Sequence, residues 1–439
     1  MDQINVLYIH SHDTGRYVQP YGYAVSTPNI QKLAEEGILF RQAFSVAPTC
    51  SPSRAGLLTG QCPHSNGQFG LVNRGFELPD CNKHIVNTLK KEGYYSALIG
   101  LQHIRKDPTS IGYDYIGEVE SNHVKHVVPK AVEFLKNTHN QPLFLSVGFS
   151  ETHRVFPSHS TDINPNYCQP PAPLPDTPEI REDMADFKTS ASILDKGIAR
   201  VLKALEENGL TNNTLVICTT DHGIAFPTMK CNLTDHGIGV MLIMKGPHGF
   251  EGGKVCDALV SQIDIFPTIC DLLDIEFPEW LEGNSIMPLV HREKKEINNE
   301  IFSEVNYHCS YEPMRAVRTK RWKYIRRYLN KNTPMLANCD PSSSKNVLLK
   351  NGWKEEFVDK EELYDLIFDP NESNNLANDP SKKDKLQNMR NKLDNWMQKT
   401  KDPLLKGEIK APPGAKVNKF DDVEPNDIWE YEERPEGYA

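Results

Sequence analysis

Cys50 has the most informative surroundings of any residue in the chain. It opens the segment Cys50-Ser51-Pro52-Ser53-Arg54, in which proline favours the first turn of a helix. A cysteine at a helix N-terminus, with arginine four residues later, lies in a positive field that suits an anion or a nucleophile. The alternative is a buried, inert cysteine before a helix, which describes most cysteines.

A second pair of residues that could carry chemistry is Asp221-His222, which follows the apolar stretch 214–220. A carboxylate beside an imidazole at the carboxyl end of a strand can bind a metal ion. A strand-end turn with aspartate as a cap is the alternative. Ser11-His12-Asp13 follows another apolar stretch, residues 4–10, and is predicted to deliver polar groups to a similar position.

Strands and helices alternate along the first 295 residues, which predicts a layered α/β sheet. Strands are predicted at 4–10, 95–99, 142–149, 214–220 and 240–244, and helices at 28–36, 84–92, 127–137, 183–207 and 265–273. Open α/β sheets bind ligands just past the carboxyl ends of their strands, where the polar residues above fall.

The pattern changes after about residue 295, and we predict two domains, residues 1–295 and 296–439. Short strands at 314–319, 322–328 and 363–366, with a helix at 382–400, predict a small α+β domain. Residues 329–360 are polar and irregular. The Pro- and acid-rich tail from Ala411 is predicted to wrap the surface or to be disordered.

Composition disfavours several classes of protein. The chain has 439 residues, with 49 Lys and Arg against 59 Asp and Glu, so a nucleic-acid partner is not expected. No apolar stretch approaches the roughly 20 residues of a membrane-spanning helix. The sequence from Met1 leaves no room for a signal peptide, and we expect a cytoplasmic protein. The ten cysteines lack disulfide or metal spacing.

The segment from Cys50 matches the C-x-P-S-R signature of the type I sulfatases, a family of the alkaline phosphatase superfamily, and continues as A-x-L-L-T-G. The resemblance runs from residue 4 to about 405. It is strongest toward the sulfamidase (heparan N-sulfatase) group, on Phe226-Pro227, Lys230-Cys231-Asn232-Leu233, His153-Arg154, Trp396 and Asp402-Pro403. It implies a catalytic domain with a large mixed β-sheet sandwiched by helices, and a smaller C-terminal α+β domain.

In that family the cysteine is oxidised to formylglycine, whose hydrate is the nucleophile. The resemblance implies this modification for Cys50, with a formylglycine-generating or sulfatase-maturating enzyme as a partner. It also implies that four residues handle the hydrate, the sulfate and the protons: Arg54, His103, His153 and Lys230.

One divalent metal ion is implied too, with Cys50, Asp13, Asp221, His222 and His12 as ligands. Ca²⁺ is usual for the family, but His12 stands where the family has aspartate, so Mg²⁺, Mn²⁺ and Zn²⁺ stay open. His12 is a ligand, a neighbour of the ligands, or misaligned with His10. Leu101 replaces a family lysine and removes one cation from the sulfate site.

The sequence predicts a metal-dependent sulfatase that hydrolyses a sulfate ester or an N-sulfate of a sulfated carbohydrate. Glu304 and His308, ahead of the family phrase Pro313-Met314-Arg315, are predicted to line the substrate mouth. Two alternatives remain: a phosphonate or phosphate diester hydrolase on the same fold, and a non-catalytic sulfoglycan-binding relative. The sugar, its linkage and the oligomeric state, a homodimer included, stay open.

Overall fold

The computed structural model describes residues 4–137 and 140–425. Eight strands form its large sheet: β1 (Asn5–Ser11), β2 (Ile38–Phe44), β3 (Tyr95–Gly100), β4 (Tyr115–Gly117), β5 (Leu143–Gly148), β6 (Thr214–Thr220), β7 (Leu242–Lys245) and β8 (Lys254–Ser261). Their order is β4-β3-β5-β1-β6-β7-β2-β8. Neighbours are parallel except at β7, which is antiparallel to β6 and β2, so the predicted mixed sheet is confirmed.

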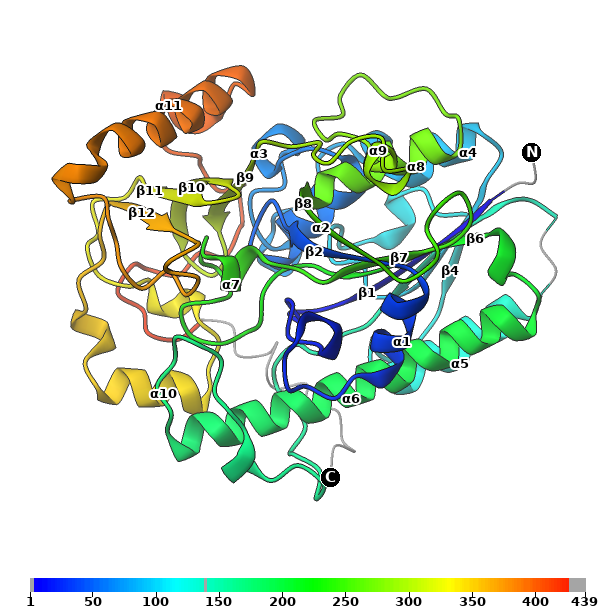
Figure 1. Ribbon diagram of the computed structural model, residues 1–439, viewed down its shortest axis with the longest axis horizontal. Coiled ribbons are helices and arrows are strands. Elements are labelled where there is room, and N and C mark those ends of the chain that lie inside the picture. The colour runs from blue at the N-terminus through cyan, green and yellow to red at the C-terminus, as the bar shows by residue number, and fades with distance from the viewer. Residues whose placement is uncertain (1–3, 138–139, 426–439) are drawn as a thin grey trace.

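Helices cover both faces of this sheet (Figure 1). In the central strand β1, Val6 and Tyr8 join one apolar core while Leu7 and Ile9 join the other, as the two-residue period of a strand requires. Helices α2 (Cys50–Thr59), α4 (Ile85–Lys91) and α8 (Ile265–Leu272) contribute to the first core. Helices α1 (Pro28–Glu36), α5 (Val124–Leu135) and α6 (Pro178–Glu207) contribute to the second. The sheet is therefore buried on both faces.

The ends of these helices follow local signals. Helix α1 begins at Pro28 and stops before Gly37, as predicted. Helix α6 begins five residues earlier than the predicted residue 183, because Thr177 caps it and Pro178 occupies its first turn. The short helices α3 (Pro63–Asn66), α7 (Asp235–Ile238) and α9 (Met287–Val290) complete the main body.

The second sheet has the order β12-β11-β10-β9 and is antiparallel throughout. Its strands are β9 (Glu300–Tyr307), β10 (Tyr311–Thr319), β11 (Trp322–Arg327) and β12 (Glu361–Asp365). Helix α11 (Lys383–Lys399) packs Leu393 and Met397 against it. A smaller α+β unit thus lies beside the large sheet, while the boundary at residue 295 stays a prediction.

One element contradicts the prediction for residues 329–360. Helix α10 (Ser343–Lys350) forms there, capped by the Ser342 hydroxyl, which accepts from the N–H of Lys345 at 3.1 Å. The polar sequence of this helix has no apolar periodicity that would predict it. Packing against α6 holds the helix in place instead, and Ser344 donates to Asp183 there.

Residues 409–425 of the C-terminal tail follow the surface of the molecule. Ile409 packs with Tyr307 and Tyr311, and the N–H of Asn418 donates to the carbonyl of Cys309 at 2.8 Å. In the described part of the chain, no helix combines the length and apolar character needed to cross a membrane. The cytoplasmic location stays a prediction.

Candidate active site and metal centre

Four strands deliver the predicted site residues to one edge of the large sheet. The register pairs Ser11 of β1 with Thr220 of β6, and Gly148 of β5 with Gly100 of β3. The segments after these strands carry His12-Asp13, Asp221-His222, His153 and His103. Parallel strands end at the same edge, so the N–H of Asp13 donates to the carboxylate of Asp221, 208 residues away, at 2.9 Å.

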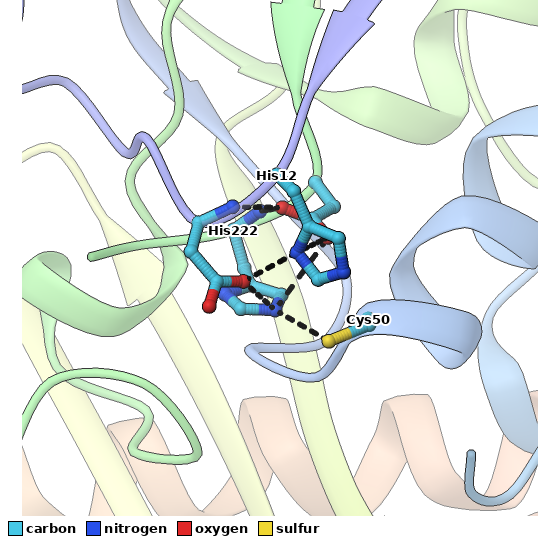
Figure 2. A group of neighbouring side chains, drawn as sticks. His12, Cys50 and His222 are labelled. Carbon is cyan, nitrogen blue, oxygen red and sulfur yellow. Dashed lines mark hydrogen bonds and ion pairs between the residues drawn. The ribbon is translucent and has the colours of Figure 1, made fainter. Parts of the chain in front are cut away.

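Five candidate metal ligands converge in one buried space. His222 Nε2 lies 3.4 Å from Cys50 Sγ and 3.2 Å from Asp13 Oδ1. His12 Nδ1 lies 2.7 Å from Asp13 Oδ1 and 3.2 Å from Asp221 Oδ2. One ligand atom of each residue lies within 4.8 Å of the others, and Figure 2 shows His12, Cys50 and His222 directed toward one another. These donors fit one divalent cation.

The two carboxylates of this cluster are ionised. Burial raises the pKa of Asp13, but Lys230 and three neighbouring imidazoles together hold that pKa well below its ordinary value. Burial raises the pKa of Asp221 as well, but Arg54, His222 and His12 together lower it below its ordinary value. Burial lowers the pKa of His12 to about 4 despite both carboxylates, so its imidazole is neutral near pH 7 and keeps a lone pair for a metal.

Cys50 is the first residue of α2, all of whose residues are buried. The Ser53 hydroxyl donates to the carbonyl of Asp221 at 2.6 Å, so this serine of the C-x-P-S-R segment anchors the helix beside the metal ligands. Burial raises the pKa of the Cys50 thiol well above its ordinary value, although Lys230 and Arg54 lower it. The reactive thiolate that the helix N-terminus suggested is therefore disfavoured, and an unmodified Cys50 is a weak nucleophile.

Both terminal nitrogens of the Arg54 guanidinium have partners at the cluster. Its Nη2 donates to Asp221 Oδ2 and to the carbonyl of Ser11, both at 2.9 Å. Its Nη1 lies 2.6 Å from Nδ1 of His10, whose Nε2 lies 3.3 Å from the hydroxyl of Ser146. His10 is thereby held outside the group of ligands, and His12 is the histidine of this strand end that enters it.

Lys230 connects the metal cluster to the smaller domain. Its Nζ donates to Asp13 Oδ2 at 2.9 Å and to Asp340 Oδ2 at 3.0 Å, and it lies 3.3 Å from His153 Nε2. Sequence reasoning missed Asp340, which is buried. A single aspartate in a polar loop carries no local signal, and only the packing of that loop against the sheet edge brings it here.

Backbone strain marks the loops that present these groups. Asp13 and His103 have φ of 55° and 58°, and Thr228 and Cys231, which flank Lys230, have φ of 63° and 66°. Such left-handed conformations cost a non-glycine residue about 1–2 kcal/mol each. They persist only where the surroundings fix the backbone, which is common at functional sites.

His153 and His103 lie on the same side as His12. The ring centroid of His12 is 4.4 Å from that of His153 and 5.8 Å from that of His103. His153 Nδ1–H donates to the carbonyl of Arg154 at 2.5 Å, which leaves Nε2 facing Lys230. Burial lowers the pKa of His103 well below its ordinary value, and its buried Nδ1 has no partner among the described residues. His103 is thus a neutral imidazole.

The two predicted substrate-binding residues have different surroundings. Glu304 is not brought to the metal cluster: its carboxylate is completely buried, bonds to His64 and lies 3.7 Å from Arg315. That position does not offer it to a substrate. His308 is buried, and burial lowers its pKa. Lys230 and His222 lie near enough to lower that pKa further. Its contact with substrate stays a prediction.

Comparisons with known proteins agree with this geometry. A family model described as Sulfatase matches residues 4–275, and one described as N-sulphoglucosamine sulphohydrolase, C-terminal, matches residues 229–356. N-sulphoglucosamine sulphohydrolase of Homo sapiens is 30% identical, covering 90% of this chain and 89% of its own. An ulvan-active sulfatase of Formosa agariphila is 26% identical, covering 95% of this chain and 77% of its own.

A solved structure shares the fold. It is a protein in complex with its substrate D-glucosamine-2-N,6-O-disulfate, with a TM-score of 0.71 and 18% identity over 91% of this chain and 99% of that one. The Sulfatase model spans more than half of the residues, and the human relative matches most of both chains. The chain therefore belongs to the sulfatase family, as the segment from Cys50 to Arg54 indicated.

Proposed function

We propose that this protein hydrolyses a sulfate ester or an N-sulfate of a sulfated sugar, with a formylglycine made from Cys50 as the nucleophile and one divalent cation. The observation that carries the proposal is the convergence of Cys50 with two carboxylates and two imidazoles in one buried space. The raised pKa of the thiol supports conversion of Cys50, because the unmodified side chain is a poor nucleophile there.

The cation would be held by Asp13, Asp221, His222, His12 and the modified residue 50. When bound, it supplies positive charge that activates a hydroxyl nucleophile and draws charge from the sulfate oxygens. Ca²⁺ is our first choice from the family, while the two imidazoles keep Mg²⁺, Mn²⁺ and Zn²⁺ open.

The protein's own side chains divide the remaining work. Lys230 and Arg54 place fixed positive charge around the sulfate and residue 50. His153, 3.3 Å from Lys230 Nζ, is the group that we expect to protonate the departing oxygen or nitrogen. His103 is neutral, and its Nδ1 has no partner in the described part of the chain; it is the group that we expect to take a proton from residue 50 as sulfate leaves.

The substrate class rests on the relatives. The human relative is named for N-sulphoglucosamine and the bacterial one for ulvan, so a sulfated carbohydrate is the shared chemistry. We therefore expect turnover of sulfated sugars, with N-sulfated and O-sulfated glucosamine as the first pair to compare.

The test combines mass spectrometry with kinetics. The protein is produced together with a sulfatase-maturating enzyme, and the peptide that contains residue 50 is examined for formylglycine. Cys50→Ala should lower turnover by at least about 10³-fold. The matched control Cys256→Ala, on β8, should retain activity.

Three outcomes would contradict the proposal. They are undiminished turnover in Cys50→Ala, faster hydrolysis of aryl phosphonates or phosphate diesters than of aryl sulfates, and binding of sulfated sugars without turnover by the modified protein.

A further inference from the structure

A cavity of about 790 Å³ lies beside His103. Its walls include Leu101 and His103 after β3, the short turn Val72–Arg74, and Gly414 and Lys416 of the C-terminal tail. Four lining side chains are cationic: Arg74, Arg105, Lys106 and Lys416. The one carboxylate in the lining, Glu77, lies 3.2 Å from Arg105 and is neutralised by it. The cavity therefore carries an excess of positive charge.

Arg74 is the buried cation of this cavity. It is only 2% exposed. Its Nη1 donates to two neutral groups, the carbonyl of Lys416 at 3.3 Å and Oδ1 of Asn418 at 3.1 Å. Its buried Nε has no hydrogen-bond partner, and no carboxylate of the described residues lies within ion-pair distance of it. A buried guanidinium without a counter-ion is costly, so this arrangement calls for an anion.

The other buried arginines show what Arg74 lacks. Each of the four pairs with an aspartate: Arg54 with Asp221, Arg154 with Asp183, Arg315 with Asp402 and Arg318 with Asp235. The fold thus supplies a carboxylate wherever it buries an arginine in the described part of the chain, except at the residue that lines the cavity.

The cavity belongs to the surroundings of the reaction centre. His103 lines it, and His308 lies within the electrostatic reach of Arg74 as well as of Lys230 and His222. The tail holds the arginine in place, since the N–H of Lys416 donates to the carbonyl of Arg74 at 2.9 Å. An anion seated on Arg74 would therefore be part of a ligand that also reaches His103.

We propose that Arg74 is the centre of a second anion site, which binds a carboxylate or a second sulfate group of the sugar substrate while the scissile sulfate lies at residue 50. This inference rests on the proposed function. A planar guanidinium with a free N–H matches the oxygens of either anion. A substrate with a neutral group at this position would leave Arg74 unpaired, so the site selects polyanionic sugars.

Binding tests the second site without any turnover. In a Cys50→Ala background, calorimetry compares three unsulfated or singly sulfated disaccharides. The first carries a uronic carboxylate, the second is its carboxyl-reduced form, and the third is that reduced form with one O-sulfate on the same ring. We expect the first or the third to bind at least about 10-fold more tightly than the second. The stronger of the two identifies the anion, and equal or undetectable binding of all three overturns the proposal.

Variants assign that preference to Arg74. Arg74→Met should abolish it and Arg74→Lys should keep part of it. Arg181→Met, which removes a partly exposed arginine paired with Asp176, should keep all of it. A preference that survives in Arg74→Met overturns the proposal. Should that variant not fold, the comparison of the three ligands on the parent protein, together with Arg74→Lys, decides.

Kinetics separate this site from the site of the scissile sulfate. Arg74→Met should raise KM for a sulfated disaccharide that carries the second anion by about 10–100-fold, with turnover of an aryl sulfate that carries no second anion unchanged. An equal loss on both substrates would show that Arg74 serves the scissile sulfate or the fold, and would overturn the inference. If the parent protein turns over neither substrate, that result would count against the proposed function. The binding comparison would still decide whether the second anion site exists.

Discussion

The ion pair between Arg154 and Asp183 supports the loop that presents His153, and its contribution can be measured. Its two bonds are 2.6 and 2.7 Å long, both side chains are 5% exposed, and the guanidinium lies 4.3 Å from the ring centroid of Phe156. Arg154→Met leaves the carboxylate of Asp183 buried, with Ser344 as a remaining partner. Because breaking a buried pair from one side strands a charge, we expect the free energy of unfolding to fall by about 3–5 kcal/mol.

Urea unfolding at pH 7, followed by circular dichroism, measures this loss against a matched variant. Arg181 of α6 also pairs with an aspartate, Asp176, at 2.5 Å, but these side chains are 30% and 63% exposed. Arg181→Met should therefore lower the free energy of unfolding far less. The double variant Arg154→Met/Asp183→Leu removes both charges and should recover part of the loss. Equal costs for the two arginine variants, or a double variant no more stable than Arg154→Met, would refute the reasoning.

Three further changes test the metal site, the sulfate site and a buried histidine. His12→Asp should shift the metal dependence of activity toward Ca²⁺ and Mg²⁺, because carboxylate oxygen suits hard cations; an unchanged preference in a metal titration would show that His12 is not a ligand. Leu101→Lys should not raise turnover, because its ammonium would enter a cavity that already holds Arg74; a large gain in kcat would contradict this. Burial lowers the pKa of His64, but Glu304 outweighs it and raises that pKa above its ordinary value, so the folded state holds this proton more tightly than the unfolded chain. That stabilisation is complete below about pH 6.5 and is lost as pH rises through the folded-state pKa, so unfolding titrations should show a decline toward alkaline pH that His64→Gln lacks.

The sequence by itself determined the elements that build the site. Residues 4–10 are apolar and β-branched enough to specify a buried strand, and Pro28 and Gly37 set the ends of α1, since both signals act within a few residues of chain. Polar residues directly after such strands predicted a shared edge, because parallel strands bring their carboxyl ends together. The five candidate ligands followed from that logic and from the family signature.

Only the tertiary structure decided the charges and partners around those groups. Asp340 reaches Lys230 across 110 residues of chain, and Glu304 reaches His64 across 240, so neither contact has a local signal. The same reason explains Cys50. The helix N-terminus seen in the sequence favours a thiolate, whereas burial raises the pKa of the thiol, and burial exists only after packing. The isolation of Arg74 is likewise invisible in the sequence, because whether a buried cation has a counter-ion depends on every segment that packs around it.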